Sequence, residues 1–173
     1  MAERISVLIE EDKVESRVRE IARQISRDYK GEEVHLICIL KGSLFFTADL
    51  AKRIECPVTI DFMSVSSYGN GTESSGRIKI VKDLDDNIEG KNVIVIEDII
   101  DSGRTLSFLM EMLKVHKPKS LKLCTFLNKP ERRVVDIDVD YIGFDIPDKF
   151  VVGYGMDYAQ KYRALPYIGV VEL

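Results

Sequence analysis

Apolar residues recur along the chain in two patterns, which predict strands that alternate with helices. Runs rich in apolar residues, typical of buried strands, occupy residues 34–40, 58–65, 92–98 and 120–127. The segments between these runs are predicted to be helices, the first of them clearly amphipathic, at residues 11–30, 41–54 and 104–117. This alternation is typical of an α/β fold with a largely parallel sheet.

The C-terminal third of the chain is richer in strands, aromatic residues and turns than in helices. It holds predicted strands at 139–147 and 167–173, and we expect it to form a small appendage on the sheet. Residues 77–82 alternate between polar and apolar side chains, as in a half-exposed strand. Residues 66–76 contain three glycines and four serines, a composition that predicts a mobile segment.

The composition fits a single domain of 173 residues and narrows the possible partners. The net charge of −4 argues against a large basic face for nucleic acid or an anionic membrane. The apolar run at 5–9 is too short for a signal peptide, and no segment approaches the roughly 20 apolar residues of a membrane helix. We therefore expect a cytoplasmic protein in which Cys38, Cys56 and Cys124 are reduced thiols.

Candidate chemistry gathers in "NVIVIEDIIDSGRTL", residues 92–106. Three carboxylates, Glu97, Asp98 and Asp101, come where a β-branched strand leads into a helix, although like charges repel and lose hydration. In open parallel sheets, ligands bind at the carboxyl ends of the strands. Free backbone N–H groups at a helix start suit a phosphate, and carboxylates suit sugar hydroxyls or Mg²⁺. The segment therefore predicts a phosphorylated sugar as ligand; a loop of solvated acids is the alternative.

Other phosphate-binding motifs do not fit the chain. There is no GxxxxGK[ST] P-loop, and the segments at 69–74 and 153–158 begin like GxGxxG but lack its third glycine. A receiver-type phosphoacceptor site would need acids on two strands, whereas here they cluster on one.

The same segment resembles the signature of the phosphoribosyltransferases: four apolar residues, two acids, two apolar residues, an acid and a loop of small residues. Further segments resemble the hypoxanthine–guanine phosphoribosyltransferases in the same order: "LKGS" (40–43), "SSYG" (66–69), "FLNKPERR" (126–133) and "IPDKFVVGYGMDYAQKYRALPYIG" (146–169). The resemblance implies a type I phosphoribosyltransferase fold, in which helices flank a mainly parallel, twisted sheet. A small hood would form from about residues 130–173 together with the N-terminal segment.

The resemblance also implies a reaction and its partners. Enzymes of this family transfer ribose 5-phosphate from phosphoribosyl pyrophosphate (PRPP) to N9 of hypoxanthine or guanine, with Mg²⁺ as cofactor. The products are IMP or GMP and pyrophosphate. Such enzymes are usually homodimers or homotetramers.

Roles at the acidic segment follow from the same resemblance. Glu97 and Asp98 would hold the ribose hydroxyls, directly or through Mg²⁺, and their charge would favour a ribosyl centre that becomes cationic. Asp101 would lie near purine N7 and act as the general base or acid for its proton. The 5-phosphate would bind to the loop formed by Ser102, Gly103, Arg104 and Thr105.

The pyrophosphate end of the site is implied by three other residues. Lys41 and Gly42 resemble the pyrophosphate loop of the family, in which the peptide bond at the position of Leu40–Lys41 is often cis. Arg163 would contact pyrophosphate from the C-terminal segment.

The purine end is implied by the segments around 129 and 150. Lys129 would donate to the 6-oxo group; Asn128 stands before it, where bacterial relatives usually have Asp. Phe150 would stack on the base, although its spacing alone predicts a core aromatic residue. The backbone of Val151 would read the base edge, and Asp157 would complete this region beside the Mg²⁺ on the pyrophosphate side.

Ser67 and Tyr68 would begin a flexible loop that closes over the site and excludes water. Two alternatives stay open. One is a regulatory, RNA-binding relative of the pyrimidine-attenuator type, whose signature also contains Gly-Arg-Thr. The other is a different base specificity: Lys129 argues against adenine, and xanthine is not excluded.

Overall fold

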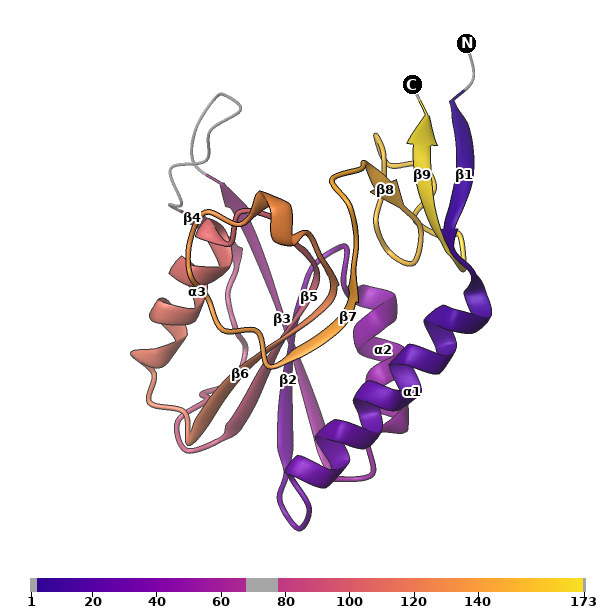
Figure 1. The fold of residues 1–173 in the computed structure, drawn as a ribbon. Helices are drawn as coiled ribbons and strands as arrows, with labels where there is room; N and C mark the ends of the chain where they lie inside the picture. Colours follow the sequence, from indigo (N-terminus) through magenta and orange to yellow (C-terminus); the bar gives the residue numbers. More distant parts are fainter. Residues whose placement is uncertain (1–2, 68–77, 173) are drawn as a thin grey trace.

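The computed structural model describes residues 3–67 and 78–172, and its centre is a six-stranded sheet (Figure 1). The strand order is β4-β3-β2-β5-β6-β7. β2, β3, β5, β6 and β7 are parallel, and β4 pairs antiparallel with β3 at one edge. The strands are β2 (Val34–Ile39), β3 (Val58–Ser67), β4 (Ile78–Lys82), β5 (Asn92–Ile100), β6 (Ser120–Asn128) and β7 (Tyr141–Asp145). The predicted, mainly parallel sheet is thus confirmed.

Helices cover both faces of this sheet, with α1 (Glu11–Asp28) and α2 (Leu44–Arg53) on one face and α3 (Arg104–Lys114) on the other (Figure 1). Successive strand residues point to opposite faces, so Leu36 packs in the core under α1 and α2 while Ile37 packs in the core under α3. Burial of each such aliphatic side chain contributes about 1.5–3 kcal/mol. Within the described ranges, no helix has both the length and the apolar character needed to cross a membrane.

A smaller antiparallel sheet forms the hood beside the main sheet (Figure 1). It consists of β1 (Arg4–Ile9), β9 (Ile168–Glu172) and β8 (Val151–Val152). Part of the range expected to form most of the hood, about residues 130–173, lies in the main sheet instead. β7 pairs with β6, because its Tyr141 is buried in the same core as Phe126, and the chain therefore leaves the main sheet only after Asp145. β1 was not predicted as a strand, since it is short and flanked by charges.

The boundary of β5 differs from the prediction in a way that matters for the acids. Pairing with β6 continues through Ile99 and Ile100, two residues beyond the predicted end at 98. Glu97 and Asp98 therefore lie within the strand, and Asp101 is the first residue after it. Most other predicted elements differ from the observed ones by up to three residues at their ends.

The three cysteines are free thiols, as predicted. Cys38 and Cys124 are buried in the sheet, and Cys56 is partly buried. Burial raises the pKa of the Cys124 thiol far above its ordinary value, so this side chain behaves as a small apolar residue.

Candidate active site

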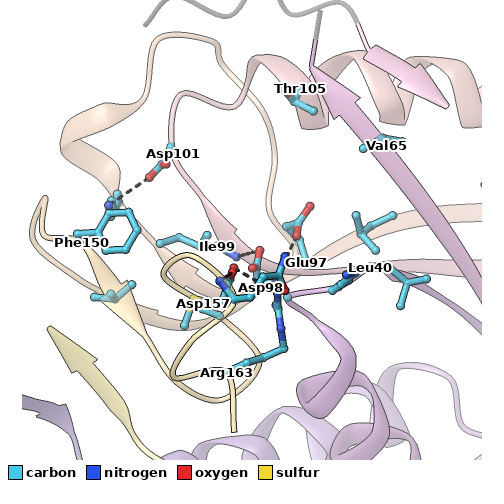
Figure 2. Close-up of a pocket in the computed structure, with 17 residues that line it drawn as sticks. Leu40, Val65, Glu97, Asp98, Ile99, Asp101, Thr105, Phe150, Asp157 and Arg163 are labelled. Carbon is cyan, nitrogen blue, oxygen red and sulfur yellow. Dashed lines mark hydrogen bonds and ion pairs between the residues drawn. The ribbon is translucent and has the colours of Figure 1, made fainter. Parts of the chain in front are cut away.

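A cavity of about 520 Å³ lies where the carboxyl ends of β2 and β5 meet the hood (Figure 2). It brings together predicted site residues that are up to 122 positions apart, from Lys41 to Arg163. The predicted residues that line it are Lys41, Gly42, Glu97, Asp98, Asp101, Thr105, Lys129, Phe150, Val151, Asp157 and Arg163. The sequence did not single out the apolar lining residues Ile39, Val65, Ile99 and Met156.

The rest of the predicted phosphate loop lies beside this cavity and is not part of its lining. Gly103 is the N-cap of α3 and has a φ of 84°, a left-handed conformation that glycine adopts without strain. Arg104 donates its backbone N–H to Ser102 Oγ at 3.3 Å. Ser67 ends β3, and Tyr68 lies outside the described residues. The roles of these five residues stay predictions.

Glu97 and Asp98 crowd two carboxylates into one edge of the cavity (Figure 2). Burial, and then the charge of Asp98, raise the pKa of Glu97 well above its usual range. Glu97 Oε1 accepts the backbone N–H of Asp98 at 3.0 Å, and Asp98 Oδ1 accepts that of Ile99 at 2.7 Å. Without a cation nearby, proton uptake by Glu97 therefore relieves the repulsion between the two acids.

This pair fits Mg²⁺ but does not form a complete site for it. Among residues 3–67 and 78–172, no three His, Cys, Asp or Glu side chains converge as metal ligands. Mg²⁺ is commonly held by one or two carboxylates together with substrate oxygens. A cation held partly by substrate oxygens would stabilise the crowded carboxylates of Glu97 and Asp98, because its charge offsets the repulsion that raises the pKa of Glu97.

The predicted pyrophosphate loop packs tightly between Asp98 and the hood. Its Leu40–Lys41 peptide bond is cis, as the family resemblance implied. A Cβ added at Gly42 would lie 1.8 Å from Asp98 Oδ2, and one added at Gly155 would lie 2.2 Å from the carbonyl oxygen of Gly42. Only glycine therefore fits at either position without movement of its neighbour.

Asp157 and Arg163 contact each other at the edge of the cavity (Figure 2). Arg163 Nη2 is 3.3 Å from Asp157 Oδ1, and the backbone N–H of Gln160 donates to Asp157 Oδ2 at 2.8 Å. Arg163 Nη1 also donates to the carbonyl of Gly155. The pair is thus fixed in place at the cavity.

Lys129 and Phe150 form the opposite end of the cavity. The residue Lys129 is only 8% exposed, and its Nζ lies 3.6 Å from Asp101 Oδ1 (Figure 2). Phe150 is 52% exposed and touches Tyr158 edge-on, with ring centroids 5.5 Å apart. The expectation from spacing alone, a core aromatic residue at 150, is therefore wrong, because Phe150 presents its ring to the cavity.

Comparison with known families agrees with this geometry. Residues 8–159 match the phosphoribosyl transferase domain family. The chain belongs to this family. The match confirms the predicted type I phosphoribosyltransferase fold.

Individual relatives indicate which group of phosphoribosyltransferases the chain is most similar to among those compared. A hypoxanthine phosphoribosyltransferase of Salmonella typhimurium is 51% identical over 175 residues, covering 100% of this chain and 98% of the relative. A crystal structure of a hypoxanthine-guanine phosphoribosyltransferase from Bacillus anthracis superposes with a TM-score of 0.94 at 57% identity, covering 96% of this chain and 98% of that one. These relatives lend no support to the regulatory RNA-binding alternative.

The chain also matches part of a longer relative. The bifunctional protein TilS/HprT of Listeria monocytogenes is 53% identical over 166 residues, or 96% of this chain. The chain spans only 26% of the length of that relative.

Sequence reasoning missed a hydrogen-bond network behind the acidic loop of this phosphoribosyltransferase. Arg133 donates from Nε to the carbonyl of Asp101 at 3.1 Å and from Nη2 to Asn128 Oδ1. Asn128 Nδ2 in turn donates to Asp145 Oδ1 at 2.8 Å. An amide at 128 accepts from Arg133 and also donates to Asp145, which a carboxylate could not do. The one signal in the sequence was Asn128 itself, in place of the usual Asp.

Sequence reasoning also missed the contact that fixes the hood over the cavity. Tyr154 donates its hydroxyl to Asp49 Oδ2 on α2 at 2.6 Å, and its ring packs on Phe126 with centroids 5.1 Å apart. Burial and this hydrogen bond raise the pKa of Tyr154. Tyr154 lies three residues after Val151, so the contact helps to hold the purine end of the site against the sheet.

Proposed function

We propose that this phosphoribosyltransferase transfers the 5-phosphoribosyl group of PRPP to N9 of hypoxanthine and guanine, giving IMP or GMP and pyrophosphate for purine salvage. The observation that supports this proposal most directly is a single cavity lined by the acid pair of β5, the buried Lys129 and the exposed ring of Phe150. The names of relatives at 51–57% identity support the same reaction. By the family resemblance, we further propose that it works in the cytoplasm as a homodimer or homotetramer.

The purine end explains a preference for 6-oxopurines. The Lys129 ammonium has three N–H donors and no acceptor, so it pairs with a 6-oxo group and not with the 6-amino group of adenine. Phe150, exposed in the cavity, offers its face for stacking on the base. The backbone of Val151, in β8, reads the base edge.

The acids serve the chemical step. As pyrophosphate departs, positive charge develops at the ribosyl centre, and Glu97 and Asp98, which line the cavity, would stabilise it. Asp101 takes up the proton at purine N7 as N9 forms its bond to the ribose. Bound Mg²⁺, held by Glu97 and Asp98 and on the pyrophosphate side by Asp157, would neutralise charge on the pyrophosphate oxygens.

PRPP carries an anionic group at each end, and a separate set of residues binds each of them. Lys41, Gly42 and Arg163 take the pyrophosphate. The 5-phosphate lies at the start of α3, where the helix dipole favours an anion, against Ser102, Gly103, Arg104 and Thr105. The segment that begins at Ser67 and Tyr68 closes the site and keeps water from the cationic ribosyl centre.

A single assay tests this proposal. Purified protein is incubated with PRPP and Mg²⁺ and with hypoxanthine, guanine, xanthine or adenine in turn, and the nucleotide product is identified by mass. We expect IMP and GMP, negligible AMP, and loss of turnover in EDTA. Xanthine as the best substrate would establish the xanthine alternative, and no turnover with any base would refute the proposed function.

A further inference from the structure

A second acidic residue, Asp148, shares the buried lysine with Asp101. Lys129 Nζ lies 3.6 Å from Asp101 Oδ1 and also 3.6 Å from Asp148 Oδ1. Asp148 comes from the segment between β7 and β8, two residues before Phe150. The Lys129 side chain is 10% exposed, whereas those of Asp101 and Asp148 are 48% and 45% exposed. The most buried of the three charges thus sits between two that keep contact with water.

The two equal distances matter because neither is a hydrogen bond. An ammonium next to a single carboxylate closes to about 2.7–2.9 Å and spends an N–H on it. At 3.6 Å from both acids, the charge of Lys129 is compensated by two carboxylates, yet its ammonium makes a hydrogen bond to neither of them. A buried ammonium needs such compensation to remain charged.

Arg132 fixes Asp148 in this position. Its Nη1 lies 3.5 Å from Asp148 Oδ2, the oxygen that does not face Lys129. The four side chains therefore alternate in charge, in the order Arg132, Asp148, Lys129, Asp101. They come from three separate parts of the chain: η1 (Pro130–Arg132) with its N-cap residue Lys129, the segment before β8, and the residue after β5.

We propose that Asp148 is a positioning residue for the purine end of the site. It draws the Lys129 ammonium away from Asp101, so that the ammonium is positioned for the 6-oxo group and Asp101 keeps a free carboxylate for the N7 proton. This inference rests on the proposed function. It predicts that loss of Asp148 impairs use of the base and leaves PRPP binding intact.

Asp148→Asn tests this with nearly constant shape. In the variant, Lys129 closes on Asp101, and kcat/KM for hypoxanthine falls roughly 10- to 100-fold, the effect of one hydrogen bond to a charged group. The KM for PRPP changes by less than about twofold. The free energy of a twofold change is only a fraction of the free energy of the hydrogen bond to the base. Asp148→Glu restores part of the activity because it restores the charge. The matched control is Asp136→Asn, which makes the same charge change at an exposed position outside the cavity.

A crystal structure of Asp148→Asn provides the readout that a merely structural role would not change. We expect the Lys129 Nζ to Asp101 distance to shorten from 3.6 Å to about 2.8 Å. An unchanged distance, or equal losses for hypoxanthine and PRPP, would overturn the positioning role. If Asp148→Asn does not fold, Arg132→Gln releases Asp148 from its second partner, and its hypoxanthine kinetics must then show the same selective loss. Failure of the wild type to turn over any base would instead refute the proposed function, and the Lys129 distance would still test the inference.

Discussion

The contact between Gly42 and Asp98 gives the sharpest mutational test of the site. An alanine at 42 places its Cβ 1.8 Å from Asp98 Oδ2 and 2.6 Å from its Cγ. Contacts of a Cβ under 3.0 Å essentially never occur. The carboxylate of Asp98 must therefore move from 1.8 Å to at least 3.0 Å, a shift of about 1.2 Å. Asp98 is only partly buried and can rotate, so we expect the fold to lose no more than about 1–3 kcal/mol, as for other overpacked positions.

The catalytic cost should be larger than this loss of stability suggests. A misplacement of about 1 Å in a reacting group can reduce the rate about 10²-fold. We therefore expect kcat/KM of Gly42→Ala to fall about 10²-fold in the hypoxanthine assay, while urea denaturation shows a folded protein. The effect should depend on Asp98. In an Asp98→Ala background, the atom nearest to the added methyl group is the Cβ of residue 98, at 3.3 Å, and the substitution should cost little further activity.

Gly31→Ala is the matched control for Gly42→Ala. Gly31 has a φ of +80°, and an added Cβ meets nothing within 4 Å. The substitution imposes roughly 1–2 kcal/mol of backbone strain far from the cavity. We expect it to lower stability and to leave kcat/KM unchanged. Wild-type kcat/KM for Gly42→Ala, or the same loss with and without the Asp98 side chain, would refute the inferred link between this close approach and catalysis.

Three further substitutions test the assigned roles. Asp101→Asn should lower kcat by about 10²–10⁴-fold with an unchanged melting temperature, and near-normal turnover would exclude it as general acid or base. Lys129→Ala should raise the KM for hypoxanthine at least about tenfold, since a hydrogen bond to a charged group is lost, with little change for PRPP. Equal losses for both substrates would make Lys129 structural. Tyr154→Phe removes the 2.6 Å hydrogen bond to Asp49 and should cost about 1.5–3 kcal/mol in urea denaturation, whereas unchanged stability would mean that this bond does not anchor the hood.

The sheet could be predicted from the sequence because its strands are buried on both faces. Runs such as residues 93–96 are β-branched without interruption, and each of these residues is fully buried in β5. The hood strands were harder to place. β1 carries exposed and partly buried residues in irregular order and is stabilised by pairing with β9, whose paired residues lie 159 to 168 positions away in the chain. Local pattern contains no information about such a partner.

The residues of the candidate site also fall into two groups, those that are neighbours in the sequence and those that only the fold brings together. The acids at the end of β5 and the start of α3 are contiguous in the chain, so a candidate ligand could be predicted for them from residues 97–105 alone. Asp148 and Arg133, by contrast, gain their importance from Lys129, Asp101 and Asn128, which come from other elements. Phe150 shows the limit most clearly: its apolar neighbours suggest a core position, yet the turn before β8 exposes its ring to the cavity.

The carboxylates of Glu97, Asp98 and Asp101 occupy two environments. Glu97 and Asp98 lie within the strand, where burial and mutual repulsion raise the pKa of Glu97 and favour a bound cation. Asp101 lies beyond the strand and contacts the ammonium of Lys129. The acids are therefore suited to different tasks, charge stabilisation in one case and proton transfer in the other.

The most direct test of this account is a crystal structure with IMP bound. We predict the 6-oxo group within about 2.7–3.2 Å of Lys129 Nζ, the base against Phe150, the ribose hydroxyls toward Glu97 and Asp98, and the phosphate at residues 102–105. A nucleotide bound in the reverse direction, with its base against Glu97 and Asp98, would contradict the account, as would one bound outside the cavity.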